Sequence, residues 1–392
     1  MAEFSSLWAL EPGLDFLNHG SFGACPRAVL EAQNEFRARM ERQPLQFLAR
    51  DLEGLLDEAR AAVAAFVGAD ADDLAFVPNA TTGVNTVLRS LQLGPGDEIV
   101  TTDHAYNSCR NALRWQEERG ARALYAKVPW PCAGPWQVVE AIMGAVNERT
   151  RLVMIDHVTS PTGLVFPVGE IVRRLAERGI DTLVDGAHAP GMLPLDLRAI
   201  GAAYYTGNCH KWLCTPKGSA FLHVRRDRQQ LIKPIAHGHG LNSQRKDRSA
   251  FRLQHDWIGT DDPTAFLCIP VAIKYLASLL PGGFAKLMER NHALALAGRR
   301  ILLDALKMEA PAPEFMLGSL AAVPLPDWAG EPPPKSGPWW HPLQKQLLQK
   351  HRIEVPIMAF PAPKLLVRIA AQLYNSEPQY SRLAAALKAE LA

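Results

Sequence analysis

The sequence predicts an α/β protein with a parallel central sheet. Short apolar runs, too short for helices, alternate over residues 74–205 with stretches whose apolar residues recur at helical spacing. Such alternation builds a parallel sheet that helices cover on both faces. The composition agrees, because 48% of the 392 residues are hydrophobic and 21% are charged, which suits a globular chain with a large core.

Two helices are expected ahead of the sheet. The first spans residues 26–43, where Pro26 suits the first helical turn. The second spans residues 51–67, and Gly68 is a typical stop signal. The apolar runs predict strands at residues 74–77, 98–101, 152–155, 182–184 and 202–205. The intervening helices are expected at residues 82–91, 108–119, 136–147 and 168–178.

The pattern changes after residue 260. A long helical stretch at residues 285–308 leads into a proline-rich segment, and further strands are expected at residues 320–323 and 365–369 before an end helix at 379–391. We therefore expect four parts in chain order. These are an N-terminal segment (1–16) that packs with the small domain, a large ligand-binding domain (17–262), a connecting helical region (263–308) and a small α+β C-terminal domain (309–392).

Charge and cysteine content narrow the range of partners and compartments. The net charge of +2 predicts neither a nucleic-acid nor a membrane partner and favours a small molecule. Six scattered cysteines without a Cys-x-x-Cys pair predict reduced thiols and a cytoplasmic location, and we find no export signal. No metal site is expected, because His-Glu-x-x-His is absent, and neither phosphate-loop nor dinucleotide glycine motif occurs.

The candidate chemistry lies just after the strands, because ligands of a parallel sheet gather at the carboxyl ends of its strands. Asn79, Ala80, Thr81 and Thr82 precede a helix and form either an anion cradle or an ordinary helix cap. His104 and Tyr106 offer two flat side chains on one loop, either of which could cover a planar ligand. Taken singly, each of these residues more often serves packing than function.

Two further strand ends carry charges. Asp185 ends a buried strand, where it either caps a turn or pairs with a protonated ring nitrogen. Lys211 follows another strand, an unusual place for a charge that could lie in water. A lysine amine, a carboxylate, a flat side chain and a helix N-terminus together match the needs of pyridoxal phosphate. A silent binding module of the same fold is the non-enzyme alternative.

Seven segments then suggest a family. The chain resembles the class V aminotransferases, which are fold-type I pyridoxal phosphate enzymes, and within them the isopenicillin N epimerase branch. The resemblance implies a homodimer with a shared active site and an amino-acid substrate. It rests on Leu17-Asn18-His19-Gly20-Ser21-Phe22-Gly23, Asp103-His104-Ala105-Tyr106, His157-Val158-Thr159-Ser160, Asp185-Gly186-Ala187-His188, His210-Lys211-Trp212, Gly259-Thr260 and Val367-Arg368-Ile369.

The same resemblance implies roles for individual residues. Lys211 would hold the cofactor covalently, Asp185 would pair with its ring nitrogen, and His104 or Tyr106 would stack on the ring. Cofactor contacts near the ring hydroxyl would come from His188 and from Thr159 or Ser160. The phosphate would be held by Ala80, Thr81, Thr82, Asn208 and His210, with Thr260 from the neighbouring subunit. Substrate contacts would come from Asn18, His19 and Arg368, of which Arg368 would receive the carboxylate.

The reaction at the α-carbon stays open at this stage. Epimerisation is the expectation that the resemblance favours. The alternatives are carbon–sulfur β-elimination from a cysteine derivative, similar to hercynylcysteine sulfoxide lyase, and amino-group transfer. A cysteine desulfurase is disfavoured, because that chemistry needs a cysteine shortly before the arginine strand and residues 352–364 contain none.

Overall fold

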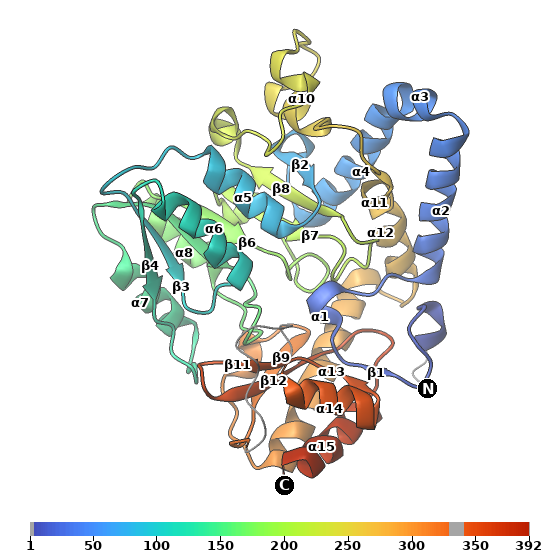
Figure 1. Cartoon of the computed structure of the whole chain (residues 1–392), viewed down its shortest axis with the longest axis vertical. Helices are drawn as coiled ribbons and strands as arrows, with labels where there is room; N and C mark the ends of the chain where they lie inside the picture. Colours follow the sequence, from blue (N-terminus) through green and yellow to red (C-terminus); the bar gives the residue numbers. More distant parts are fainter. Residues whose placement is uncertain (1–3, 329–340, 392) are drawn as a thin grey trace.

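The centre of the protein is a seven-stranded sheet. The structure is a computed structural model that describes residues 4–328 and 341–391. The strand order is β2-β8-β7-β6-β5-β3-β4, and only β8 runs antiparallel to its neighbours (Figure 1). The prediction of an α/β fold with a mostly parallel sheet is therefore confirmed. Its strands are β2 (Leu74–Val77), β3 (Glu98–Thr102), β4 (Arg122–Ala126), β5 (Thr150–Asp156), β6 (Asp181–Asp185), β7 (Tyr204–Asn208) and β8 (Ala220–Val224).

Helices cover both faces of this sheet, as the alternation of side chains along its strands requires. Leu152 and Leu183 belong to the apolar core beneath α5 (Ala80–Ser90) and α6 (Asn107–Glu117). Their neighbours Val153 and Val184 point to the opposite face and belong to the core beneath α7 (Pro135–Ala145) and α8 (Val168–Ala176). The sheet is thus buried on both faces, which explains why its strands appear in the sequence as continuous apolar runs.

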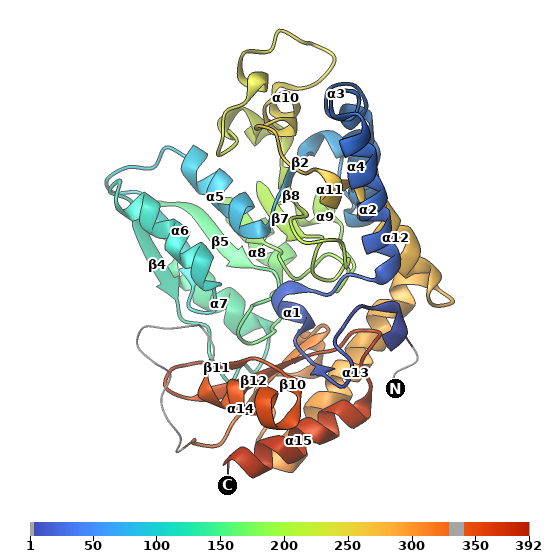
Figure 2. The same cartoon turned by 45° about the vertical axis from the view of Figure 1, so that its right-hand side comes forward.

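A layer of helices flanks the sheet on the β2 side (Figure 2). The predicted stop of α4 at Gly68 is confirmed, because Gly68 has a φ of +65°. A Cβ atom there would lie 2.8 Å from the Asp196 Cα atom, so only glycine fits. The helices outside the sheet layers are α1 (His19–Phe22), α2 (Arg27–Arg42), α3 (Pro44–Gln46), α4 (Leu52–Val67), α9 (Leu197–Ile200), α10 (Ala250–Asp256), α11 (Thr264–Leu267), α12 (Ile269–Ser278) and α13 (Gly283–Leu306).

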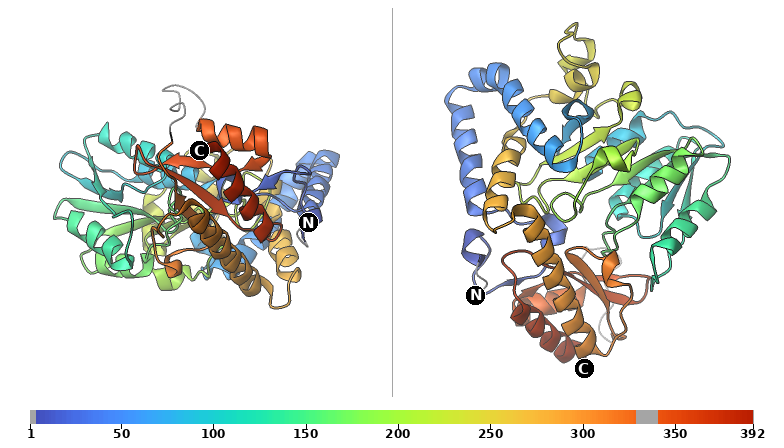
Figure 3. Two further views of the ribbon diagram at one scale, coloured as in Figure 1. Left: turned by 90° about the horizontal axis from the view of Figure 1, so that it is seen from below. Right: turned by 180° about the vertical axis from the view of Figure 1, so that it is seen from behind.

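A second, antiparallel sheet lies near the C-terminus, in the order β11-β12-β9. The long helix α13 extends from the large sheet towards it (Figure 3). Near the N-terminus, β1 (Asp15–Phe16) pairs with β10 (Ile353–Glu354), so this segment contacts the C-terminal part. The exact domain boundaries stay a prediction. The elements are β9 (Leu320–Pro324), α14 (Pro342–His351), β11 (Ile357–Ala359), β12 (Leu365–Ala370) and α15 (Glu377–Leu391).

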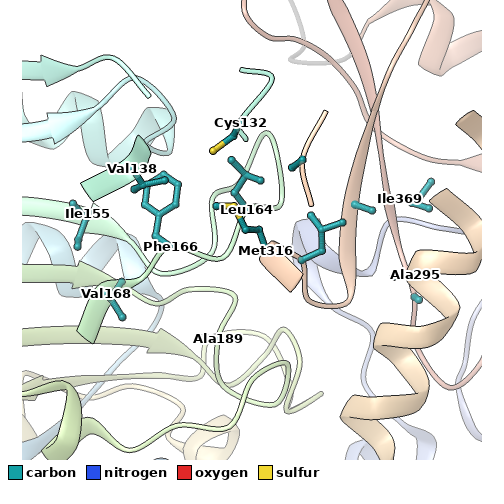
Figure 4. Close-up of a cluster of buried hydrophobic side chains, with 14 of the residues drawn as sticks. Cys132, Val138, Ile155, Leu164, Phe166, Val168, Ala189, Ala295, Met316 and Ile369 are labelled. Atoms are coloured by element: carbon teal, nitrogen blue, oxygen red, sulfur yellow. The ribbon is translucent and has the colours of Figure 1, made fainter. Parts of the chain in front are cut away.

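One apolar core joins the two sheets. Ile155 and Phe166 lie on the large-sheet side, Met316 lies between the sheets, and Ile369 and Ala295 lie on the side of the small sheet (Figure 4). Because these side chains belong to one continuous cluster, the large and small sheets hold a fixed relation. The carboxyl ends of the large-sheet strands therefore keep a constant position relative to the small sheet.

The helices and the ionisable side chains of residues 4–328 and 341–391 bear on membrane and metal binding. None of the helices there is by itself long and apolar enough to cross a membrane. The segments Thr264–Ser278 and Gly283–Leu306 meet that requirement only as a pair, which is bent by 72°. The same ranges contain no group of three or more His, Cys, Asp or Glu side chains that could hold a metal ion.

Candidate active site

A cavity of about 450 Å³ lies at the carboxyl ends of the central strands. Asp185 ends β6, Asp156 ends β5, and the two residues are register partners in the sheet. Asn208 ends β7, and Lys211 follows on the next loop. All four line the cavity, so the structure brings together strand ends that lie far apart in the sequence.

The Lys211 amine is buried inside this cavity. Its Nζ atom lies 3.2 Å from His188 Nε2, and the Trp212 indole Nε1 donates a hydrogen bond to His188 Nδ1 at 3.4 Å. Because a neutral imidazole with an accepting Nδ1 carries its proton on Nε2, His188 can donate to the Lys211 amine when that amine is uncharged. Burial lowers the pKa of Lys211 to about 8, although the Asp185 carboxylate opposes this shift. Lys211 is thus placed as a base.

The loop that carries Lys211 is held from behind by α1. His19 Nε2 lies 2.9 Å from the Lys211 carbonyl oxygen, and His19 Nδ1 lies 2.8 Å from the Tyr374 hydroxyl. A Cβ atom on Gly23 would lie 2.1 Å from the His210 carbonyl oxygen, so the close approach requires glycine. His19 is fully buried, and burial lowers its pKa to about 3. The expectation that His19 contacts substrate is therefore wrong, since this neutral ring supports the lysine loop.

Asp185 is oriented by two donors. The Ala187 backbone N–H donates to Asp185 Oδ1 at 3.0 Å, and the Cys109 thiol donates to Asp185 Oδ2 at 3.0 Å. Burial raises the pKa of Cys109 well above its ordinary value, so this side chain keeps its proton and acts as a donor. Sequence reasoning missed Cys109, because 76 residues separate it from Asp185.

The second carboxyl group, Asp156, was also missed. Burial raises its pKa well above the ordinary value, and the neighbouring Asp185 carboxylate raises it further. Two carboxyl groups this close favour one shared proton, so Asp156 is expected to be the protonated partner. The only sequence signal was its place at the end of an apolar strand.

Helix α5 directs its N-terminus at the cavity. Asn79 caps this helix, because its Oδ1 accepts from the Thr82 N–H at 2.8 Å and from the Thr82 hydroxyl at 3.1 Å. The Ala80 N–H donates to Asn208 Oδ1 at 2.8 Å. Ala80, Thr81 and Asn208 line the cavity, whereas Thr82 does not. The structure therefore corrects the expected role of Thr82, which stabilises the cap.

Two basic side chains line the same end of the cavity. His210 Nδ1 donates to the Ser219 carbonyl oxygen at 2.8 Å, and burial lowers the pKa of His210 to about 4. Lys217, seven residues after His210, also lines the cavity and was not predicted. Burial also lowers the pKa of Lys217. A neutral imidazole, a lysine and a helix N-terminus together form a setting that suits an anion.

The structure separates His104 from Tyr106. The His104 ring is fully buried, with Nδ1 2.9 Å from the Thr162 hydroxyl and Nε2 3.2 Å from the Val128 carbonyl oxygen. It packs against Phe360 with ring centroids 4.5 Å apart, and burial lowers its pKa to about 4. Tyr106 is 38% exposed and lines the cavity. His104 therefore lies outside the cavity and does not match the expectation that it could cover the ligand, whereas the position of Tyr106 is compatible with that role.

Arg368 lies on β12 and is buried. Its Nη1 donates to the Ser160 carbonyl and, at 3.2 Å, to the Ser160 hydroxyl, while Nη2 donates to the Ser21 hydroxyl at 3.0 Å. Among the residues that the structure describes, Arg368 Nε is buried without a hydrogen-bond partner. Burial lowers the pKa of Arg368 to about 10, so the side chain stays charged at neutral pH. A buried cation with a donor to spare suits a carboxylate.

The remaining predicted residues divide into two groups. Ser160 and Asn18 line a second cavity of about 560 Å³ that also includes Lys211 and Arg368. Thr159 is buried away from both cavities, with its hydroxyl 2.7 Å from the Thr162 hydroxyl, so its expected cofactor contact is corrected. Thr260 is exposed and lies outside both cavities of its own chain.

The sequence of this chain is similar to those of known proteins. The family model of the class V aminotransferases matches residues 20–327. The chain belongs to the class V aminotransferase family. It is 37% identical to an isopenicillin N epimerase of Amycolatopsis lactamdurans over 97% of this chain and 96% of that protein. It is also 28% identical to an L-cysteine desulfhydrase of Arabidopsis thaliana over 95% of this chain and 87% of that protein.

A solved structure agrees at the level of the fold. The chain superposes on the cystine C-S lyase C-DES with a TM-score of 0.78 and 21% identity, over 96% of each chain. That C-DES structure is a mutant with glycine covalently linked to its pyridoxal phosphate cofactor. The predicted family, fold type and pyridoxal phosphate dependence are thereby confirmed for this class V aminotransferase.

The residues present fit pyridoxal phosphate. A buried amine, Lys211, shares one cavity with the Asp185 carboxylate, and the N-terminus of α5 lies on the same wall with Thr81. The lining therefore offers a nucleophile, a partner for a protonated ring nitrogen and donors for a phosphate. These are the complementary groups that a class V aminotransferase needs at one place.

Proposed function

We propose that this chain is a pyridoxal phosphate enzyme that removes the α-proton of an amino acid and returns it, as an epimerase does. The observation that carries the proposal is the buried Lys211 amine, which contacts His188, has a lowered pKa and shares its cavity with Asp185. The similarity to isopenicillin N epimerase over almost the whole chain supports the same reaction type.

The cofactor-holding residues follow from the cavity. When bound, pyridoxal phosphate stabilises the negative charge that develops at the substrate α-carbon. We propose that Lys211 is its covalent anchor and that Asp185, fixed by the Cys109 thiol, pairs with the ring nitrogen. Tyr106 covers the ring, and the phosphate end is formed by Ala80, Thr81, Asn208, His210 and Lys217.

Proton removal is assigned to Lys211. With a pKa of about 8, a minor fraction of Lys211 is uncharged at pH 7, this fraction rises with pH, and the uncharged amine accepts a proton. Arg368 orients the substrate, because its guanidinium is fixed by Ser160 and Ser21 and retains a free buried donor for the carboxylate. Asn18 lines the adjoining cavity, where it contacts the substrate side chain.

Epimerisation also needs an acid that returns the proton from the opposite face. Tyr106 lines both cavities and carries a hydroxyl group, so we assign this role to Tyr106. β-Elimination from a cysteine derivative needs no such acid and is the second candidate, favoured by the similarity to L-cysteine desulfhydrase. Amino-group transfer is the remaining alternative in this family.

One experiment distinguishes these reactions. The purified enzyme is incubated in deuterated water with a panel of amino acids, and the products are analysed by NMR and chiral chromatography. We expect deuterium at the α-carbon and both enantiomers. Pyruvate with ammonia would instead establish elimination, and a keto acid would establish transfer. Lys211→Ala serves as the control, since it should lose both the yellow absorbance of the bound cofactor and the exchange.

We also propose a homodimer whose subunits share their active sites, with Thr260 contributed by the neighbour. Thr260 is exposed in its own chain, which leaves it accessible to a second subunit. A mixture of Thr260→Ala and Lys211→Ala chains, unfolded and refolded together, should regain activity that neither variant has alone. Its absence in a mixture shown to contain mixed dimers would refute the shared site. The cytoplasmic location stays a prediction.

A further inference from the structure

The second cavity extends away from the reaction centre towards the small sheet. It shares Ser21, Tyr106, Ser160 and Lys211 with the first cavity, so the two are continuous at the position of the substrate. Its volume of about 560 Å³ lies within the range of pockets that enclose drug-sized ligands. A cysteine side chain, one methylene and one sulfur, would leave most of this space unfilled.

The lining changes in character along the cavity. Leu348, Ile357 and Met358 provide apolar surface on the wall formed by α14 and β11. Arg368 and Lys211 line the same cavity. A ligand held at Arg368 by its carboxylate would therefore lay its side chain against aliphatic groups, which favours a chain of methylenes.

A fixed carboxylate lies on the same wall. Asn18 Nδ2 donates to Glu354 Oε1 at 3.4 Å, and Gln344 Nε2 donates to the same oxygen at 3.0 Å. Glu354 Oε2 takes part in neither bond. Because two neutral amides hold one oxygen without neutralising the charge, Glu354 is oriented as an acceptor for a donor on the ligand.

Glu354 lies on the strand next to Pro356, which contacts the backbone of Arg368. The Arg368 backbone N–H donates to the Pro356 carbonyl oxygen at 3.2 Å, and Glu354 lies two residues before Pro356. Glu354, Arg368 and Lys211 line the same cavity, so one ligand can contact all three.

We propose that Glu354 determines the substrate class, which comprises amino acids whose side chain is aliphatic and ends in an ammonium or another N–H donor. This inference rests on the proposed function, because it places the substrate carboxylate at Arg368 and the α-carbon at Lys211. Lys345 also lines this cavity and would attract a negatively charged side chain. The test therefore includes 2-aminoadipate, whose side chain ends in a carboxylate.

The test uses three L-amino acids with similar chains and different ends: lysine, norleucine and 2-aminoadipate. Dissociation constants are measured on the holoenzyme from the absorbance change of the bound cofactor, and α-deuterium exchange is followed in parallel. We expect lysine to bind about tenfold more tightly than norleucine, and 2-aminoadipate to bind most weakly. The substitution Glu354→Gln should bring the lysine-to-norleucine ratio close to one.

The matched control is Glu309→Gln, which removes the same charge from an exposed position outside both cavities and should keep the wild-type ratio. If Glu354→Gln does not fold, the wild type still decides, because added salt should weaken lysine binding more than norleucine binding. Equal binding of lysine and norleucine, tighter binding of 2-aminoadipate, or a lysine preference that survives Glu354→Gln would overturn the assignment. A holoenzyme without α-exchange on any amino acid would instead refute the proposed function.

Discussion

The buried charge of Lys211 makes a quantitative prediction about the apoprotein. In the wild type, folding moves this ammonium out of water, and burial lowers its pKa from 10.5 to about 8. The substitution Lys211→Met keeps an apolar chain of similar length and removes the ionisable group. We expect the apo form of the variant to gain stability relative to the apo wild type at neutral pH.

The magnitude follows from the two pKa values. At 1.36 kcal/mol for each unit of pH, the difference between 10.5 and about 8 corresponds to a cost of about 3 kcal/mol in the free energy of unfolding. Below pH 8, Lys211 is protonated in both states and the full cost is present. As the pH rises from about 8 to 10.5, the folded state loses its proton first and the cost disappears.

The stability difference between the variant and the wild type should therefore shrink by about 3 kcal/mol across that pH range. Urea unfolding of both apoproteins, at equal protein concentration and followed by tryptophan fluorescence, measures this difference. Lys233→Met, a substitution at an exposed lysine, reports the effect of the replacement itself. A Lys211→Met difference that is constant over this pH range, or that grows with pH, would contradict the burial of an ionisable amine.

Three further sets of substitutions test the site. Arg368→Lys keeps the charge but loses the forked donors, so we expect kcat/KM for amino acids to fall about 10- to 100-fold. Cys109→Ala removes a donor to Asp185 and should weaken cofactor binding about fivefold, whereas Cys109→Ser restores the donor and the affinity. His104→Ala should lower the Tm by about 4 °C, because it leaves the buried Thr162 hydroxyl and Val128 carbonyl without their partner. Tyr106→Phe should leave the Tm unchanged and reduce the rate of epimerisation.

Each of these expectations has a result that would count against it. An unchanged kcat/KM in Arg368→Lys would show that Arg368 does not bind the substrate carboxylate. Equal cofactor dissociation constants for the two Cys109 variants would show that the thiol only fills space. A Tyr106→Phe enzyme with the wild-type rate of epimerisation would show that Tyr106 is not the acid that returns the α-proton.

The apolar runs predicted five of the seven large-sheet strands, because a strand buried on both faces is continuously apolar. β4 was missed, since its residues from Arg122 are only partly buried, and β8 was also missed. For β7, the expected range of 202–205 stops too early. The second half of that strand, which includes Thr206 and Asn208, is polar but fully enclosed by β6, β8 and the site.

Among the site residues too, some could be predicted from the sequence and others could be placed only by the structure. Lys211 and Asp185 could be predicted, because the cofactor needs both residue types and strand ends of a parallel sheet converge. His104 and Tyr106 could not be told apart, since a single turn of the loop decides which of them faces the cavity. His19 matched a motif of substrate contacts, yet its hydrogen bonds to Lys211 and Tyr374 place it behind the lysine loop.

The order and chemical types of the residues were thus sufficient to establish the fold class, the family and the cofactor. Contacts over long separations were decided only when the chain folded. The thiol of Cys109 on Asp185 and the amide of Asn18 on Glu354 join residues 76 and 336 positions apart. Such contacts depend on how whole layers pack, and local residue patterns carry no information about that packing.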